Sequence, residues 1–232
     1  AGVTSTDALA TAYLTATVGG IFNGAPGGAS NVSSGRTFLT AQTDIGTALN
    51  PLFTEVGMIQ SISTTGSTYV TNEGALNVDV LDGGLGDGQF AGGSVQTVAS
   101  SPITVASNII SGTGIELFAD ETKAAGFGDY DTITVLADIL VQAATGDILF
   151  DAGDHIIIEA ATLAGLAGVH ALDGNVEFRA DFDRADLGDL EINTDVSGGQ
   201  ITVLGTVNAS DNISMTTHGD DDTITLSGIV DA

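Results

Sequence analysis

The segment that decides the fold is ITVLGTVNA (residues 201–209), which returns as ITLSGIVDA (residues 224–232), 23 positions later. Earlier segments fit the same pattern. The first residues of this series are, in chain order, Ile103, Ile133, Ile156, Val176, Ile201 and Ile224, with steps of 30, 23, 20, 25 and 23 residues. A recurring step of this size is typical of a repeat protein in which each repeat is one turn of a stack.

A second series of apolar segments lies between the members of the first. Its segments begin at Ile115, Ile148, Val169, Leu190 and Ile213, and the last three steps are 21, 21 and 23 residues. Hairpin pairing demands no common period, whereas stacked coils do, because each coil lays its strands on those of the coil before it. The two interleaved series therefore favour a solenoid.

Within each segment, apolar residues alternate with Thr, Ser, Asp or Glu, the pattern of a strand with one buried face. Gly, Asp and Asn, which favour turns, separate the segments. In the last segment, we expect three apolar side chains to share the buried face: Ile224, Leu226 and Ile229. We also expect the last coil to stop early, with its second strand barely begun. Such a coil would leave backbone groups and apolar side chains uncovered.

These patterns predict an all-β fold, a parallel β-solenoid over residues 75–232 with three short strands per coil. About seven coils would make a rod about 33 Å long, since stacked strands lie about 4.8 Å apart. An antiparallel sandwich also uses many short strands, but it does not require a fixed period. We therefore expect the solenoid.

Residues 1–74 have a different pattern and are expected to form either a mixed, partly helical N-terminal cap or irregular first coils. In STDALATAYLTATVGGIF (residues 5–22), Leu9 and Tyr13 have helical spacing after a possible N-cap at Ser5 or Thr6. A weaker helical pattern covers residues 40–59, with Pro51 in its middle. A cap would cover the exposed core and strand edge at one end of the solenoid.

The charge balance is strongly acidic, with 30 acidic and 4 basic residues and a net charge of −26. Such a surface repels nucleic acid and anionic lipid, and it suits a medium rich in salt or calcium. The chain has no cysteine, which excludes disulfides and zinc–thiolate sites. No apolar run reaches the roughly 18 residues expected of a membrane span. The opening residues lack the pattern of a signal peptide, so a removed signal, a longer parent chain and another export route all stay open.

The search for catalytic residues gives one weak candidate. None of the three histidines, His155, His170 and His218, lies in a recognised catalytic motif. Asp181, Asp183 and Arg184 could form a lyase-like constellation, but surface ion pairs and solvated turns explain them better, because an anionic polysaccharide would meet a strongly anionic protein. Aromatic residues make up 5% of the chain, which disfavours the stacking of sugars. We therefore expect no enzymatic activity.

Calcium is a better supported ligand. The segment DFDRADLGD places four carboxylates within nine residues, at Asp181, Asp183, Asp186 and Asp189. Calcium prefers several carboxylate oxygens from one flexible loop, although the spacing differs from that of an EF-hand. We predict a calcium site here, with ordinary Asp-rich turns as the alternative.

Three segments resemble the coils of filamentous-haemagglutinin-like adhesins, which are large bacterial surface β-helices: GDILFDAGDHIIIEA (146–160), GNVEFRADF (174–182) and DNISMTTHGDDDTITLSG (211–228). The resemblance covers about residues 103–232. The composition, poor in Lys and rich in Thr, Ala, Gly and Asp, also resembles that of bacterial S-layer proteins. The resemblance implies an elongated, extracellular or cell-surface protein that serves in adhesion or matrix building.

The expected function is that of a non-enzymatic structural or adhesive component of an extracellular bacterial assembly, such as a fibre, matrix or surface layer. Its expected partner is a second copy bound end to end, or flanking parts of a longer parent protein. The alternative is a β-helix that binds carbohydrate or cleaves polysaccharide. A groove with clustered ionisable and aromatic side chains would favour this alternative.

Overall fold

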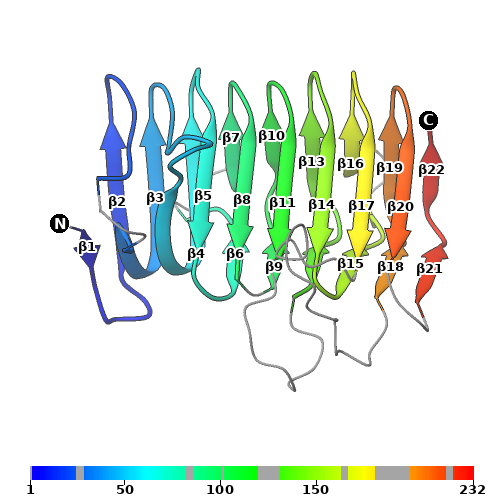
Figure 1. The fold of residues 1–232 in the computed structure, drawn as a ribbon, viewed down its shortest axis with the longest axis horizontal. Coiled ribbons are helices and arrows are strands. Elements are labelled where there is room, and N and C mark those ends of the chain that lie inside the picture. Colours follow the sequence, from blue (N-terminus) through cyan, green and yellow to red (C-terminus); the bar gives the residue numbers. More distant parts are fainter. Residues whose placement is uncertain are drawn as a thin grey trace.

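The structure is a computed structural model that describes residues 2–24, 29–81, 86–100, 102–119, 131–162, 167–180, 199–217 and 222–232. The chain forms a parallel β-solenoid, and the pairings between its described strands all belong to one sheet that winds around a single core. The coils lie side by side from β1 at one end of the rod to β22 at the other (Figure 1). The expected fold class is therefore confirmed.

Each complete coil contributes three strands, which stack on their equivalents in three columns called faces C, A and B in chain order. Face C contains β5 (Thr68–Asn72), β8 (Val95–Ala99), β11 (Ile115–Ala119), β14 (Ile148–Ala152), β17 (Val176–Ala180) and β20 (Ile213–Thr217). Face A contains β6 (Leu76–Val78), β9 (Ile103–Val105), β12 (Ile133–Val135), β15 (His155–Ile158), β18 (Gln200–Val203) and β21 (Thr223–Leu226). Face B contains β7 (Gln89–Ala91), β10 (Ile109–Ser111), β13 (Leu140–Ala143), β16 (Gly168–Ala171), β19 (Thr206–Ala209) and β22 (Ile229–Asp231).

The first coils are built mostly from longer strands, which are β2 (Thr11–Ala16), β3 (Val32–Ala41) and β4 (Leu52–Ser63). The short strand β1 (Val3–Thr4) precedes them. β4 alone pairs with β5, β6 and β7, so it spans all three faces. From Leu76 onward, faces A and B each hold six strands, against the roughly seven coils expected there. With the first three levels the stack has nine levels and a length of about 38 Å, given a strand spacing of about 4.8 Å.

The helical interpretation of residues 1–74 is wrong, because the described part of this segment forms parallel strands and no helix. On β2, Ala12, Leu14 and Ala16 pack against the core, while Tyr13 is 64% exposed. This alternation is the period of a strand, and it outweighs the helical spacing of Leu9 and Tyr13. Pro51 immediately precedes β4, a position where the missing N–H interrupts no ladder. The strands support irregular first coils.

The first series of segments predicts one column of stacked side chains, and face A confirms this column except at Val176. Ile103, Ile133, Ile156, Ile201 and Ile224 are successive register partners, and the first four are fully buried. Val176 does not lie between Ile156 and Ile201. It belongs to face C, where it pairs with Ile148 and Ile213.

The reason for this error is the uneven length of the coils. Residues 181–198 lie between β17 and β18, so 45 positions separate the face A neighbours Ile156 and Ile201. A search for a 23-residue step therefore takes Val176 as the missing member. The second series fails in the same way, because Val169 lies on face B, between Val141 and Val207.

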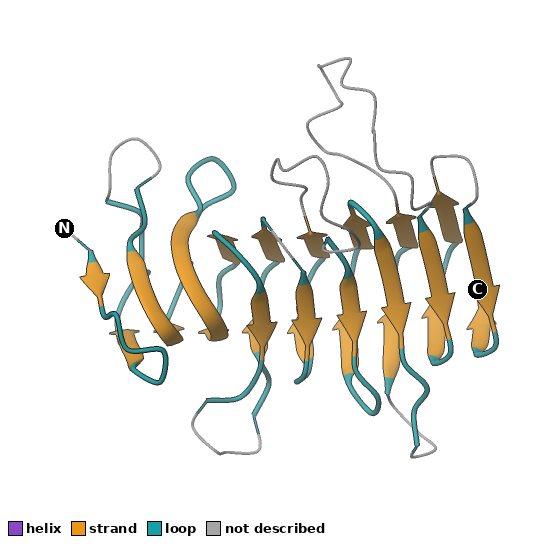
Figure 2. Cartoon of the chain, turned by 90° about the horizontal axis from the view of Figure 1, so that it is seen from below, coloured by secondary structure: helices purple, strands orange, loops and turns teal. Residues whose placement is uncertain are grey.

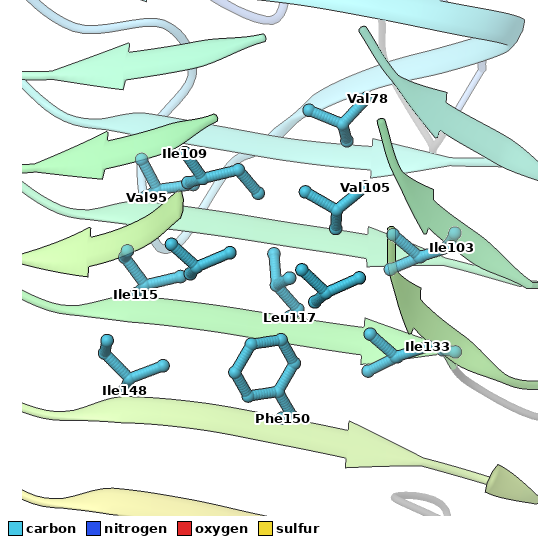
Figure 3. Packing of buried hydrophobic residues seen from close by; sticks show 14 of the residues in the cluster. Val78, Val95, Ile103, Val105, Ile109, Ile115, Leu117, Ile133, Ile148 and Phe150 are labelled. Atoms are coloured by element: carbon cyan, nitrogen blue, oxygen red, sulfur yellow. The ribbon is translucent and has the colours of Figure 1, made fainter. Parts of the chain in front are cut away.

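Inward side chains of successive coils form continuous columns, which are apolar over much of the rod and include buried polar residues such as Gln89 and Thr97. Several apolar members are visible in Figure 3. The rings of Phe150 and Phe178, neighbours on face C, stack with centroids 5.2 Å apart and an interplanar angle of 22°. Small residues follow where face C ends: Ala99, Ala119, Ala152 and Ala180 are buried register partners. Stacking equivalent side chains thus lets each coil cover the inward side chains of the next.

Replacing Ile156 by Ala should lower the free energy of unfolding by about 2–5 kcal/mol, because it leaves a cavity in a fully buried column. The matched control is Ile157→Ala, one residue further along the same strand, where the side chain faces outward and is only half-buried. Urea denaturation followed by circular dichroism measures both changes. Equal losses at the two positions would contradict the inward–outward assignment.

Candidate functional site: the two end faces of the rod

The last coil presents a sheet edge that no described strand covers. We call this surface, formed by β20, β21 and β22, the C-terminal end face; each of its strands pairs only with the coil before it among the described residues. Ile224, Leu226 and Val230 are 45%, 52% and 38% exposed. Their partners one coil earlier, which are Ile201, Val203 and Val207, are fully buried. The core is thus uncovered at this surface.

Two expectations about this coil are corrected. The coil does not stop early, because β20, β21 and β22 supply a strand to each of the three faces. Ile229 does not share the inward direction of Ile224 and Leu226, since it aligns with Thr206, whose neighbour Val207 is the buried residue. Val230 holds the inward position instead. The alternation within β22 and the 23-residue step from Val207 would both have identified Val230.

The turn between β21 and β22 lies close to the turn of the coil before it. Gly228 lies directly above Gly205, and a Cβ atom at position 228 would collide with the carbonyl oxygen of Gly205. Ser227 and Gly228 separate the two strands. Counting by twos from Ile224 and Leu226 passes Gly228 and leads to Val230, so the alternation continues across the turn and Ile229 falls on the outward side.

The opposite end of the rod, which we call the N-terminal end face, is formed by β1 and β2. Both strands pair only with β3 among the described residues, so their outer edges are uncovered there. Val3 is 45% exposed, whereas its partner Val32 is fully buried. Ala12, Leu14 and Ala16 are the inward side chains of β2 and are only partly buried. Figure 2 shows the two termini at opposite ends of the row of coils.

A groove of about 680 Å³ follows the outer side of face C and the turns that lead into it. Its outward strand positions include Tyr69, Gln96, Glu116, Leu149 and Glu177. Its described lining includes no Lys, Arg or His, and Tyr69 is its one aromatic residue. The groove therefore offers amides, hydroxyls and carboxylates to a bound molecule.

Polar side chains on the turns beside this groove bind each other from coil to coil. Oδ1 of Asp147 accepts hydrogen bonds from the backbone N–H of Asn175 at 2.8 Å and from Asn175 Nδ2 at 2.9 Å. Asn175 Oδ1 in turn accepts from Asn212 Nδ2 at 2.9 Å. The backbone hydrogen bond from Asn175, assisted by the side-chain bond, lowers the pKa of Asp147 below its ordinary value of 3.8.

The residues considered for catalysis are not gathered into one site in the described part of the chain. Arg179 Nε binds Glu177 Oε1 at 2.8 Å, and Arg179 Nη1 lies 3.8 Å from Oδ2 of the buried Asp151. The hydrogen bond that Arg179 donates to the Glu177 carboxylate raises the pKa of Arg179. His155 Nδ1 accepts from the N–H of Gln200, and His170 lies beside Asn208. Asp181, Asp183, Arg184 and His218 lie outside the described residues.

The predicted calcium ligands Asp181, Asp183, Asp186 and Asp189 also lie outside the described residues. Among the residues that are described, no three His, Cys, Asp or Glu side chains are grouped closely enough to hold a metal ion. The described chain likewise includes no helix long and apolar enough to cross a membrane.

Comparison with protein-family models, with curated proteins and with solved structures finds no match to this chain. The class is therefore defined by the fold and the end faces alone: a parallel β-solenoid with an exposed sheet edge at each described end.

Replacing Asp147 by Asn should reduce the free energy of unfolding at neutral pH, because the charged acceptor of the Asn175 bonds is lost. A carboxyl group with a lowered pKa stabilises the fold fully above the pKa of the unfolded state, near 3.8, and this contribution disappears as the pH falls through the folded-state pKa. Urea denaturation of both proteins at a series of pH values measures the difference. A difference that stays constant down to pH about 2 would contradict this assignment.

Proposed function

We propose that the protein is a non-enzymatic structural or adhesive module of an extracellular bacterial assembly, such as a fibre, matrix or surface layer, and that it associates end to end. The observation that carries this proposal is the pair of uncovered end faces. An exposed strand edge with apolar side chains beneath it pairs readily with another chain. The partner is a second copy of the protein, or flanking parts of a longer chain that contains it.

The stacked architecture of the rod and its net charge support a structural role. A stack of coils holds its shape through local contacts between neighbours and can be extended without limit by further coils. Contact between unlike ends is heterologous, and it generates a filament when the rotation does not close into a ring. The net charge of −26 suits an extracellular or cell-surface medium in which salt screens the repulsion between copies.

The groove on face C favours the alternative function, a β-helix that binds carbohydrate. Amide and carboxylate groups such as Gln96, Glu116 and Asn175 line it, and they form the kind of hydrogen bonds that hydroxyl groups of a sugar require. A single aromatic residue among the described lining provides little stacking surface. A structural role therefore remains the better supported proposal.

End-to-end association should be lost when charge is placed on the inward side of β21. The double variant Ile224→Lys/Leu226→Lys should weaken association about 100-fold or more, since an unpaired buried charge costs well over the roughly 1.4 kcal/mol that corresponds to a factor of ten. Analytical ultracentrifugation over a range of protein concentrations, at an ionic strength of about 0.15 M or higher, measures association.

The matched control is Thr223→Lys/Thr225→Lys, which changes the net charge equally on the outward side of the same strand. It should associate as the unaltered protein does. An unaltered protein that remains monomeric at all concentrations would overturn end-to-end association. Equal weakening by both double variants would show that charge, and not the apolar surface, governs it.

We further propose that calcium binds the carboxylates of Asp181, Asp183, Asp186 and Asp189. The support is the clustering of these residues in the sequence and the excess of negative charge. A ligand that binds only the folded state raises stability by about 2.7 kcal/mol at 100 times its dissociation constant. Calcium should therefore raise the melting temperature above that in magnesium or in chelator.

The calcium effect should disappear in Asp181→Asn/Asp183→Asn and persist in Glu73→Gln/Asp211→Asn, which removes the same charge elsewhere. Differential scanning calorimetry of the three proteins in calcium, magnesium and chelator compares them. Identical melting temperatures of the unaltered protein in all three solutions would contradict a calcium site.

A further inference from the structure

We infer that the partner of the C-terminal end face is the N-terminal end face of a second copy, which continues the parallel sheet in a single defined register. This inference rests on the proposed end-to-end association and specifies its geometry. Three independent columns of inward side chains lead to the same alignment.

The first column runs along face A. Leu226 is joined through successive register partners to Val203, Ile158, Val135, Val105, Val78, Ile59, Thr37 and finally Ala12 on β2. A second copy shifted along the rod by nine strand spacings, about 43 Å at about 4.8 Å each, would therefore place Ala12 one spacing beyond Leu226. The exposed leucine would then meet a small side chain.

The second column runs along face B. Val230 is joined to Val207, Val169, Val141, Ile109, Gln89, Ser61, Leu39 and finally Leu14 on β2. The same translation places Leu14 of the second copy against Val230. Two apolar side chains, each partly exposed at its own end face, would cover each other.

The third column runs along face C. Thr217 is joined to Ala180, Ala152, Ala119, Ala99, Asn72, Thr54, Val32 and finally Val3 on β1. The same translation brings Val3 of the second copy to Thr217. One movement thus continues the columns on all three faces, and it gives the backbone N–H and C=O groups of both end faces parallel-sheet partners.

The chain already contains the kind of junction that this contact requires. On β2, faces A and B form one continuous strand, whereas β21 and β22 are separated by a turn. Within the chain, β4 is such a continuous strand, and it pairs with the separate strands β6 and β7. Met58 and Ile59 pair with β6, while Ser61, Ile62 and Ser63 pair with β7. β2 can therefore pair with β21 and β22 in the same manner.

Contact between two identical ends lacks this fit. All described strand pairings in the rod are parallel, so a translated copy keeps the strand direction and the inward side of every column. Joining two C-terminal end faces by a two-fold rotation would make the strands antiparallel and would oppose Leu226 and Val230 to other large residues. The head-to-tail arrangement is the one that continues the existing packing.

Cysteine cross-linking tests the register directly, because the chain has no cysteine of its own. On the outward side of face A, the column from Thr225 leads to Thr11, so these residues should be neighbours across the junction. Neighbouring parallel strands place their Cα atoms about 4.8 Å apart, within the range of a disulfide. Within one molecule, Thr11 and Thr225 lie at opposite ends of the rod (Figure 1).

The double variant Thr11→Cys/Thr225→Cys should form a ladder of covalent multimers on oxidation. A mixture of the single variants Thr11→Cys and Thr225→Cys should form dimers that contain one copy of each. The register control is Thr11→Cys/Ser227→Cys. Across the junction, the Cα atoms of its two cysteines would lie roughly 8 Å apart, too far for a disulfide, so this variant should not form the multimer ladder. Mass spectrometry identifies the linked peptides, and ultracentrifugation of the reduced proteins reports association independently.

The reduced proteins could associate while Thr11→Cys/Ser227→Cys cross-links as strongly as Thr11→Cys/Thr225→Cys, or while Thr225→Cys alone cross-links most strongly. Either result would overturn the register and leave end-to-end association intact. Monomers in the reduced state, without multimers on oxidation, would overturn both. A ladder specific to Thr11→Cys/Thr225→Cys would support both.

Discussion

The structure depends on the lateral hydrogen bonding of parallel strands between successive coils. From β3 to β19, each described strand pairs with strands one coil earlier and one coil later. Because backbone polar groups must be paired when water is excluded, every coil requires a neighbour on both sides. The three-column core, the tight turns and the exposed ends all follow from this requirement.

The same requirement makes the end faces chemically different from the rest of the surface. Along the sides of the rod, outward residues such as Thr202 and Glu177 need no partner beyond solvent or each other. At the ends, Leu226 and Val3 belong to columns that are otherwise fully buried, and they lie beside backbone groups of an open sheet edge. The proposed function therefore rests on the ends, although a groove of about 680 Å³ lies along face C.

Much of this architecture could be predicted from the sequence, because period-two alternation and the 23-residue step are direct consequences of stacked strands. The isoleucine column of face A followed from those two signals. Val176 was misplaced because residues 181–198 lengthen one coil, and a sequence period cannot separate a long coil from two short ones. Ile229 was chosen wrongly, since counting by twos from Ile224 and Leu226 leads to Val230, which lies against the buried Val207. The strand character of β2 was missed although Ala12, Leu14 and Ala16 alternate, since the helical spacing of Leu9 and Tyr13 competed with it.

The central claim is that inward and outward residues form columns in the register described here, and an intramolecular disulfide tests it most directly. Ile157→Cys/Thr202→Cys joins outward register partners on face A, whose Cα atoms should lie about 4.8 Å apart. Ile157→Cys/Glu177→Cys instead joins the positions that a uniform repeat would make neighbours. Mass spectrometry of the oxidised monomers should find a disulfide in the first protein and free thiols in the second. A disulfide in the second protein and not in the first would contradict the stacking of β15 on β18.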